Sequence, residues 1–209
     1  MAEPLRIPVF PLSGAILLPR TQLPLHIFEP RYRAMVRDAL AGDRLIGMVQ
    51  PRDLGEPPAL YGTGCLGRIE SAEELEDGRF NIVLEGVGRF RVVREVEADT
   101  LYRQIEADCG AFEDAEEEEP LGLAHRADLE QESRRYADAL GYAVDWEAVG
   151  RLDDETLVNG IVQIAPLDAG SKQALLEAPD MAARCELLVQ FMQFQRMIPG
   201  GADGPETLQ

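Results

Sequence analysis

Lysine, histidine and cysteine are all scarce in this chain. Of its 209 residues one is lysine (Lys172), two are histidine (His26 and His125) and three are cysteine. A phosphate-binding loop needs the pattern GxxxxGK[ST], and no such pattern surrounds Lys172, so the usual P-loop ATPase is excluded. The two histidines lie in different halves of the chain and no HExxH pattern occurs, which argues against a zinc hydrolase.

The three cysteines, Cys65, Cys109 and Cys185, are odd in number, far apart and never arranged as CxxC. This spacing supports neither a disulfide framework nor a set of zinc ligands. The N-terminus also lacks a basic segment followed by an apolar one, and no window approaches the length of a membrane span. We therefore expect a soluble, cytoplasmic protein that folds without disulfides, metal ions or cofactors.

The residues for nucleophilic catalysis are missing as well. The chain contains no GxSxG elbow, and the sequence neighbours Ser171 and Lys172 would diverge on a helix instead of forming a Ser-Lys dyad. His26 alternates with apolar Leu25 and Ile27, which favours a hydrogen-bonded structural histidine over a catalytic base. We predict no catalytic residues, and we do not expect an enzyme.

Residues 62–67 read GTGCLG and so match the dinucleotide-binding pattern GxGxxG. A dinucleotide fold needs an apolar strand directly before this pattern and a helix directly after it. Here two prolines, Pro57 and Pro58, lie just upstream, and a predicted strand runs through the glycines. The pattern therefore favours a glycine-tolerant strand over a cofactor loop.

Negative charge is what the chain has in excess, with a formal net charge of −18. Residues 1–110 hold 13 basic and 17 acidic side chains, whereas residues 111–209 hold 7 basic and 21 acidic ones. Such a field repels phosphate backbones and anionic lipids, so neither nucleic acid nor a membrane is expected as a partner. We interpret the acidic run at residues 113–119 as a solvated linker, with a site for a basic partner as the alternative.

The first half of the chain predicts strands broken by proline and glycine, with one helix among them. Asp77-Gly78 is a hairpin turn pair, and Gly86-Val87-Gly88 predicts a tight turn or a bulge before a second alternating run at 90–96. Pro30 suits the first position of a helix. The strands are predicted at 6–10, 15–18, 23–28, 44–49, 66–69 and 80–84, and the helix at 30–40.

The second half predicts helices. Asp153, Asp168 and Asp180 each stand where a capping side chain is expected, and Gly141 is a helix stop. In the last helix we expect an apolar face that includes Phe194 to be buried. The predicted organisation is α+β: a β-rich part at 1–111, an acidic connection at 112–120, an α-helical bundle at 121–198 and a disordered tail at 199–209.

Three segments in order, IPVFPL at 7–12, LLP at 17–19 and LPLHIFEPRYR at 23–33, resemble the start of the N-terminal domain family of Lon proteases, most closely its short bacterial stand-alone members. Similar stretches continue to about residue 197. The resemblance implies a PUA-like β pseudobarrel of six strands followed by a helical bundle. It also implies polypeptide recognition without the AAA+ and peptidase modules of Lon.

The resemblance leads to the main hypothesis, a non-catalytic module that binds unfolded or extended polypeptide. Its partners would then include a component of a proteolytic system. An uncharacterised hydrolase or peptidase and an RNA-binding PUA-like protein are the alternatives. Candidate peptide-binding residues are Leu17, Leu18 and Pro19, in a loop-prone stretch, with Arg31 and Arg33 at the first helix. The alternative for these residues is that the leucines fill the barrel and the arginines form surface ion pairs.

We predict that limited proteolysis cuts the chain first within residues 112–120, because this stretch has too few apolar side chains to be buried. The two fragments should remain associated, since the helices carry more apolar surface than a short bundle buries by itself, and a groove would lie beside that interface. Mass spectrometry and size-exclusion chromatography of the digest measure both. Fragments that separate and melt independently would contradict the second expectation.

Overall fold

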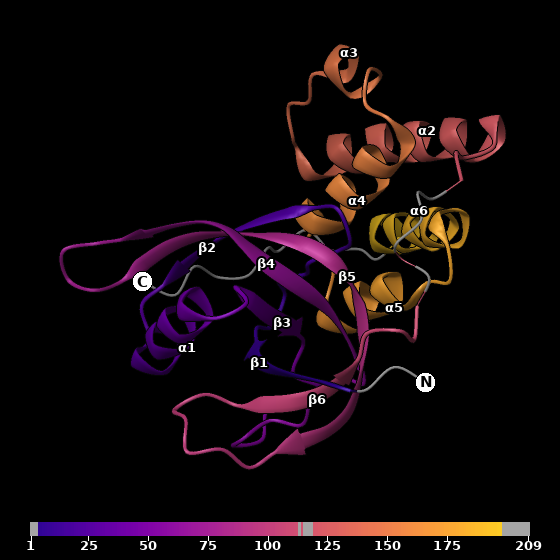
Figure 1. The fold of residues 1–209 in the computed structure, drawn as a ribbon. Coiled ribbons are helices and arrows are strands. Elements are labelled where there is room, and N and C mark those ends of the chain that lie inside the picture. The colour runs from indigo at the N-terminus through magenta and orange to yellow at the C-terminus, as the bar shows by residue number, and fades with distance from the viewer. Residues whose placement is uncertain (1–3, 113, 115–118, 198–209) are drawn as a thin grey trace. The chain divides into compact units, whose positions relative to one another are not determined.

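The computed structural model describes residues 4–112, 114 and 119–197 (Figure 1). The chain forms two compact units, unit 1 (residues 1–117) and unit 2 (residues 118–209). The predicted tail at 199–209, and residues 113 and 115–118 of the predicted acidic connection, lie outside the described residues. The elements are β1 (Leu5–Pro11), β2 (Gln22–Ile27), α1 (Pro30–Ala41), β3 (Leu45–Val49), β4 (Thr63–Glu74), β5 (Phe80–Val96), β6 (Gln104–Asp108), α2 (Leu123–Leu140), α3 (Trp146–Val149), α4 (Asp154–Ile164), α5 (Ala169–Glu177) and α6 (Met181–Met197).

Unit 1 is built on a six-stranded sheet in the order β2-β5-β4-β3-β1-β6, and β5 also pairs with β6. The additional pairing joins β5, β4, β3, β1 and β6 into a closed ring of five strands, to which β2 is attached through β5. Only β1 and β3 run parallel; the other pairs are antiparallel. With the helices that follow, this arrangement confirms the α+β class.

The length of β5 explains how one strand serves both the ring and β2. One edge of β5 pairs with β4 from Phe80 to Arg91, while the other edge pairs first with β2, through residues 80–85, and then with β6, through residues 91–96. The glycine pair Gly86 and Gly88 lies between these two halves. The pairing with β4 shifts register there, so the predicted bulge is confirmed and the alternative, a tight turn, is wrong.

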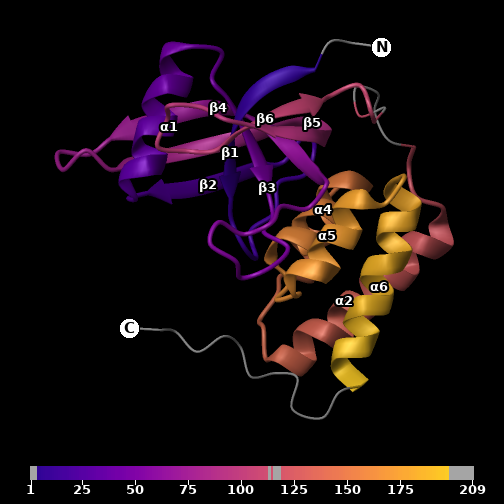
Figure 2. The same ribbon diagram turned by 90° about the horizontal axis from the view of Figure 1, so that it is seen from below.

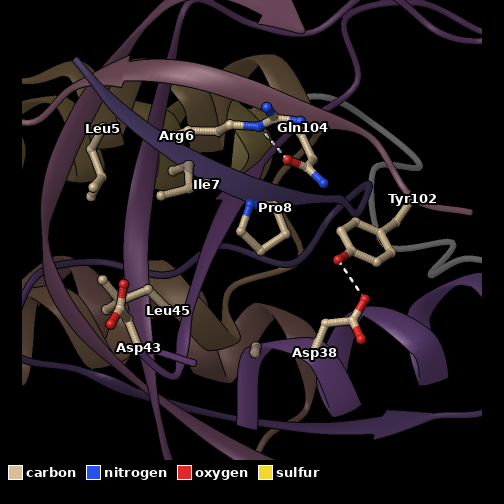
Figure 3. Close-up of a pocket in the computed structure, with 10 residues that line it drawn as sticks. Leu5, Arg6, Ile7, Pro8, Asp38, Asp43, Leu45, Tyr102 and Gln104 are labelled. Carbon is tan, nitrogen blue, oxygen red and sulfur yellow. Dashed lines mark hydrogen bonds between the residues drawn. The ribbon is translucent and has the colours of Figure 1, made fainter. Parts of the chain in front are cut away.

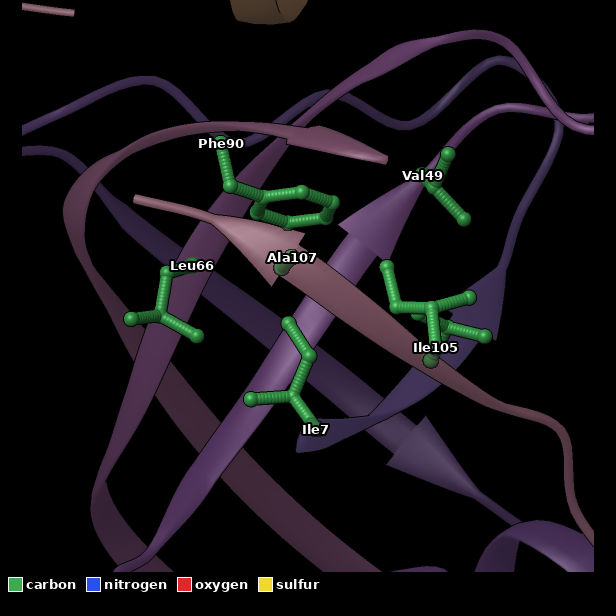
Figure 4. Packing of buried hydrophobic residues seen from close by; sticks show 7 residues of the cluster. Ile7, Val49, Leu66, Phe90, Ile105 and Ala107 are labelled. Carbon is green, nitrogen blue, oxygen red and sulfur yellow. The ribbon is translucent and has the colours of Figure 1, made fainter. Parts of the chain in front are cut away.

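All five strands of the ring contribute to one buried cluster, in which Phe90 is fully enclosed (Figure 4). Each fully buried side chain of this size stabilises the fold by about 1.5–3 kcal/mol relative to its exposed state. No member of the cluster comes from β2. The members are Ile7, Val9, Val49, Leu66, Phe90, Ile105 and Ala107.

Two glycines leave the space that the Phe90 ring occupies. A Cβ atom on Gly64 would lie 2.4 Å from the Met48 carbonyl oxygen and 2.5 Å from Cζ of Phe90, and one on Gly47 would lie 3.1 Å from the same Cζ. Gly64 is the second glycine of the GxGxxG match, and that stretch runs into β4 with no helix after it. The glycines therefore serve close packing, as the sequence favoured.

Some predictions about individual elements are wrong. Residues 15–18 form no strand, β6 and the one-turn helix α3 were not predicted, and the run at 80–84 joins the run at 90–96 in one strand. The side chain of Phe194 is 63% exposed instead of buried. These errors arise where an apolar run alone does not determine which face, or which partner, the fold provides.

The start of the acidic connection is attached to unit 1. The Arg89 guanidinium donates to the Asp114 carboxylate through Nε at 2.9 Å and Nη2 at 2.7 Å, and the Arg89 backbone N–H donates to it at 2.6 Å. Both side chains are more than nine-tenths buried. The ring of Phe112 lies 4.5 Å from the same guanidinium. The expectation that this stretch is exposed therefore does not hold for Asp114, because its charge is fully paired.

In unit 2, α6 packs against α2, α4 and α5. The predicted caps are confirmed: Asp153 accepts from the Thr156 N–H at 2.8 Å, Asp168 from the Ser171 N–H at 2.9 Å and Asp180 from the Ala183 N–H at 2.8 Å. Gly141 ends α2 in the left-handed conformation, which glycine adopts without strain. Local signals therefore determine the helix boundaries.

Several polar side chains are buried among these helices. Glu132 of α2 is 2% exposed and accepts from the Arg196 guanidinium of α6 at 2.6 and 3.1 Å. Lys172 is 5% exposed, and its Nζ donates to the Gln163 carbonyl at 3.2 Å. Arg184 donates to the Leu175 carbonyl and to Asn159 Oδ1.

Every helix among the described residues is too short or too polar to cross a lipid bilayer.

We predict that Gly64→Ala destabilises the protein by about 2–3 kcal/mol, because the added methyl group meets the Met48 carbonyl and the Phe90 ring. Gly62→Ala is the matched control, since a Cβ atom there has nothing within 4 Å and its effect should stay within about 0.5 kcal/mol. Urea unfolding followed by circular dichroism measures both. Equal midpoints for the two variants would show that the packing around Phe90 is looser than described.

A second prediction concerns Lys172, whose pKa is lowered from its ordinary value because burial disfavours the ammonium group. The charge therefore costs stability below the folded-state pKa, and this cost disappears as the pH rises toward 10.5. The free energy of unfolding of Lys172→Met should be within about 1 kcal/mol of the wild-type value at pH 7. As the pH rises, the wild type should become more stable relative to this variant. Lys172→Arg stays charged and should show no such gain. Melting temperatures at pH 7, 8.5 and 10 test this; parallel pH profiles for all three proteins would contradict it.

Candidate functional site

The three predicted site residues before β2 are all buried. Leu17 is 1% exposed and Leu18 is 0% exposed, and Pro19 is buried beside them. The side chain of Leu17 lies where a Cβ atom on Gly67 would meet it at 2.9 Å, against β4. Side chains with so little exposed surface cannot touch a peptide in this conformation. Their placement favours the alternative that the leucines fill the core, and we do not carry them into the site.

The two predicted arginines lie in different surroundings on α1. Arg31 is exposed, pairs with the Glu29 carboxylate at 2.8 Å and lies over the Tyr32 ring, 4.5 Å from its centroid. Arg33 is half-buried, and its Nε is enclosed without a hydrogen-bond partner. Its Nη2 packs against the hairpin turn at Gly78, 2.3 Å from the position of a Cβ atom there. The structure therefore brings Arg33 to the β4–β5 hairpin, while Arg31 forms the surface ion pair that was the alternative.

The residues that a Ser-Lys dyad would need are engaged in holding unit 2 together. The Ser171 hydroxyl donates to the Asp168 carboxylate at 2.7 Å, and Lys172 Nζ donates to the Gln163 carbonyl. The first contact ties Ser171 to Asp168, the N-cap of α5, and the second joins α5 to α4. No group of three or more metal-binding side chains gathers anywhere in the described parts of the chain.

A small cavity of about 160 Å³ opens where β1 separates from β3 (Figure 3). It forms because the first half of β1 pairs with β6 and only the second half, from Val9, pairs with β3. The Tyr102 hydroxyl donates to Asp38 at 2.7 Å, and burial together with that carboxylate raises the pKa of Tyr102 to about 12. This phenol stays protonated at neutral pH and joins the segment before β6 to α1. The cavity is too small for a peptide segment.

A larger hollow of about 520 Å³ lies on the face of the sheet formed by β2, β5 and β4. These strands are neighbours in the sheet, and their hairpin tip extends away from the ring (Figures 1 and 2). We call this feature the sheet-face hollow. Its lining residues are Pro24, Leu25, His26, Ser71, Ala72, Glu73, Asn81, Ile82 and Val83.

A row of hydrogen-bonded side chains crosses the sheet-face hollow. His26 Nδ1 lies 2.8 Å from Asn81 Oδ1, and Asn81 Nδ2 donates to Glu73 at 3.1 Å. Because the Asn81 oxygen can only accept, His26 Nδ1 carries the proton, and Nε2 accepts from Arg79 Nη1 at 3.2 Å. Both ring nitrogens are therefore engaged, which agrees with a structural histidine. The row therefore lines the sheet-face hollow with side chains that are already hydrogen-bonded to one another.

Sequence reasoning missed this row as a unit. Alternation along the chain did place His26 and Asn81 on the polar side of their strands. The register that pairs His26 with Asn81, and Asn81 with Glu73, depends on the β2–β5 and β4–β5 pairings. That register is a long-range property, and no local pattern in the chain specifies it.

Comparison with known proteins places these features in a family. The family model described as the ATP-dependent protease La (LON) substrate-binding domain matches residues 6–193. The chain is 31% identical over 203 residues to Lon protease 2 of Myxococcus xanthus, covering 92% of this chain and 24% of the relative. It is 29% identical over 196 residues to Lon protease 2 of Sorangium cellulosum, covering 88% and 24%. The chain thus spans about a quarter of the length of these relatives.

Solved structures agree with this match. The crystal structure of a Lon N-terminal domain protein from Xanthomonas campestris has a TM-score of 0.67 and 26% identity, and the match covers 90% of this chain and 99% of that one. The N-terminal domain of Lon protease from the Mycobacterium avium complex, at 18% identity and a TM-score of 0.63, shares the fold. This chain belongs to the Lon substrate-binding domain family.

Proposed function

We propose that this protein is a non-catalytic module that binds unfolded or extended polypeptide as part of a proteolytic system. The observation that carries the proposal is the match of the substrate-binding domain family to residues 6–193, nearly the whole chain. The same resemblance underlies the proposals of a PUA-like pseudobarrel for unit 1, which the closed ring of five strands supports, and of a cytoplasmic location.

Several contacts support a binding role over the alternative of a hydrolase or peptidase. The Ser171 hydroxyl is bonded to the carboxylate of Asp168, the N-cap of α5, and Lys172 is enclosed beside α4. Both nitrogens of His26 are taken up by Asn81 and Arg79. Nucleophilic catalysis needs a base within hydrogen-bond reach of the nucleophile, and these groups meet other partners. The engaged groups favour a surface that binds without reacting.

The net charge of −18 weighs against the third function, RNA binding. Nucleic-acid affinity depends on basic side chains that displace counterions from phosphates, and this chain has nearly twice as many acidic as basic residues. The same charge favours polypeptides with basic stretches. Arg33 beside the β4–β5 hairpin and Arg31 on the exposed side of α1 stay in the proposal as contacts for an acidic or polar group of a bound chain.

We expect the purified protein to bind reduced, carboxymethylated casein with a micromolar Kd and to leave it intact, with no turnover of peptide esters or ATP. Fluorescence anisotropy measures the binding, and gel electrophoresis and phosphate release measure the turnover. Arg31→Glu and Arg33→Glu should each weaken binding severalfold, whereas unchanged affinity would remove the residue from the site. Turnover that disappears with a serine or histidine substitution would overturn the non-catalytic proposal.

A further inference from the structure

The strand β2 ends the sheet of unit 1. It pairs with β5 and with no second strand among the described residues. An edge strand carries backbone N–H and C=O groups that point sideways, away from its partner. Pro24 lies in the middle of β2, which fits an edge because proline has no N–H to give to a ladder.

The register shows which backbone groups face outward. The Gly86 N–H donates to the Thr21 carbonyl at 2.8 Å, next to the pair formed by Gln22 and Glu85. In an antiparallel ladder this contact makes Gln22 and Glu85 a pair without mutual backbone hydrogen bonds. The two kinds of pair alternate along the strand, so Pro24 with Val83 and His26 with Asn81 also form pairs without mutual backbone hydrogen bonds. Their backbone groups point away from β5, toward the outer edge of β2.

We propose that an extended, basic segment of polypeptide binds as an additional strand along the outer edge of β2. The inference rests on the proposed function and assigns the place and the form in which the polypeptide binds. The Pro24 carbonyl would accept from the backbone of the added strand. The backbone N–H and carbonyl of His26 would exchange two hydrogen bonds with it. A helix cannot make these contacts, because its own backbone groups are already bonded to one another.

At the C-terminal end of β2, the aromatic ring of Phe28 lies next to the strand edge. Phe28 follows β2 directly and is 61% exposed, and its ring stacks with that of His26 at a centroid distance of 6.3 Å. An exposed ring beside a free strand edge is a contact for an apolar side chain of the added strand. At the other side of the His26 backbone, Pro24 borders the sheet-face hollow, which can take a long side chain that folds over the proline ring.

Charge distinguishes a basic segment from a second copy of this chain. Three carboxylates, Glu70, Glu73 and Glu85, belong to the exposed face beside β2. Of the two arginines there, Arg68 lies opposite Glu85 and Arg79 is paired with Asp77, so the face is acidic on balance. The whole chain has a net charge of −18. Two copies joined through their β2 edges would bring these acidic faces together, and like charges that meet at an interface cost several kcal/mol. A lysine-rich or arginine-rich segment meets complementary charge at the same place.

The test uses backbone substitutions in the full chain. His26→Pro removes the outward N–H, leaves the hydrogen bonds to β5 in place and requires only the extended backbone that Pro24 already adopts. His26→Ala, the matched control, keeps the N–H and removes the ring. Pro24→Ala adds an outward N–H. Circular dichroism and melting temperature establish that each variant is folded before binding is measured.

The probe is a fluorescein-labelled 11-residue peptide of alternating lysine and valine. We expect His26→Pro to weaken its Kd by about tenfold, His26→Ala by less than about threefold, and Pro24→Ala to tighten it by about threefold, since one hydrogen bond is lost or gained. A peptide N-methylated at alternate residues on its bonding edge should lose at least about tenfold. A glutamate peptide of the same pattern should not bind. Equal affinities of the wild type and His26→Pro, or of the methylated and unmodified peptides, would overturn the proposal.

Carboxymethylated casein separates this inference from the proposed function. Casein that binds equally to the wild type, His26→Pro and Pro24→Ala would leave the polypeptide-binding function in place and remove β2 as its site. Absence of binding of both casein and the lysine peptide by the wild type would reject both proposals. A wild-type dimer in sedimentation velocity that His26→Pro dissociates, with no binding of the lysine peptide, would assign the edge to a second copy and so overturn the proposal.

Discussion

The ring of five strands in unit 1 depends on the space left for one side chain. The Phe90 ring occupies the positions that Cβ atoms on Gly47 and Gly64 would approach, and it is enclosed by apolar side chains from every strand of the ring. A protein interior packs as densely as an organic crystal, so a single additional methyl group at such a point has to displace backbone or ring atoms. The glycines of β4 therefore belong to the core, whatever their resemblance to a phosphate-binding loop.

Closure of the ring also determines which strand keeps an edge without a partner strand. β5 is long enough to give half of one edge to β6 and the other half to β2, and Gly86 and Gly88 lie where the edge changes partner. A strand within the ring has neighbours on both sides, whereas β2 is held by β5 alone. The same arrangement lines up His26, Asn81 and Glu73 across three strands beside that edge. The core and the proposed binding surface thus follow from a single strand.

The polar side chains of unit 2 that sequence reasoning considered for catalysis are engaged in structural contacts. The Ser171 hydroxyl donates to Asp168, the N-cap of α5, and Lys172 is enclosed beside α4. Glu132 and Arg196 join α2 to α6. Buried groups of this kind need hydrogen-bond partners, and Glu132 and Lys172 find theirs within unit 2.

Local physical chemistry determined much of this protein from the sequence alone. Capping aspartates such as Asp153 and Asp168, Gly141 as a helix stop and the turn at Asp77-Gly78 act over a few residues, so they could be predicted. The α+β class followed from the change of pattern between the two halves, and the family from the resemblance of its motifs. Only the tertiary structure decided that Leu18 is buried, that Phe194 is exposed and that His26 meets Asn81. These outcomes depend on strand register and on the pairing of residues more than fifty positions apart, which no local pattern encodes.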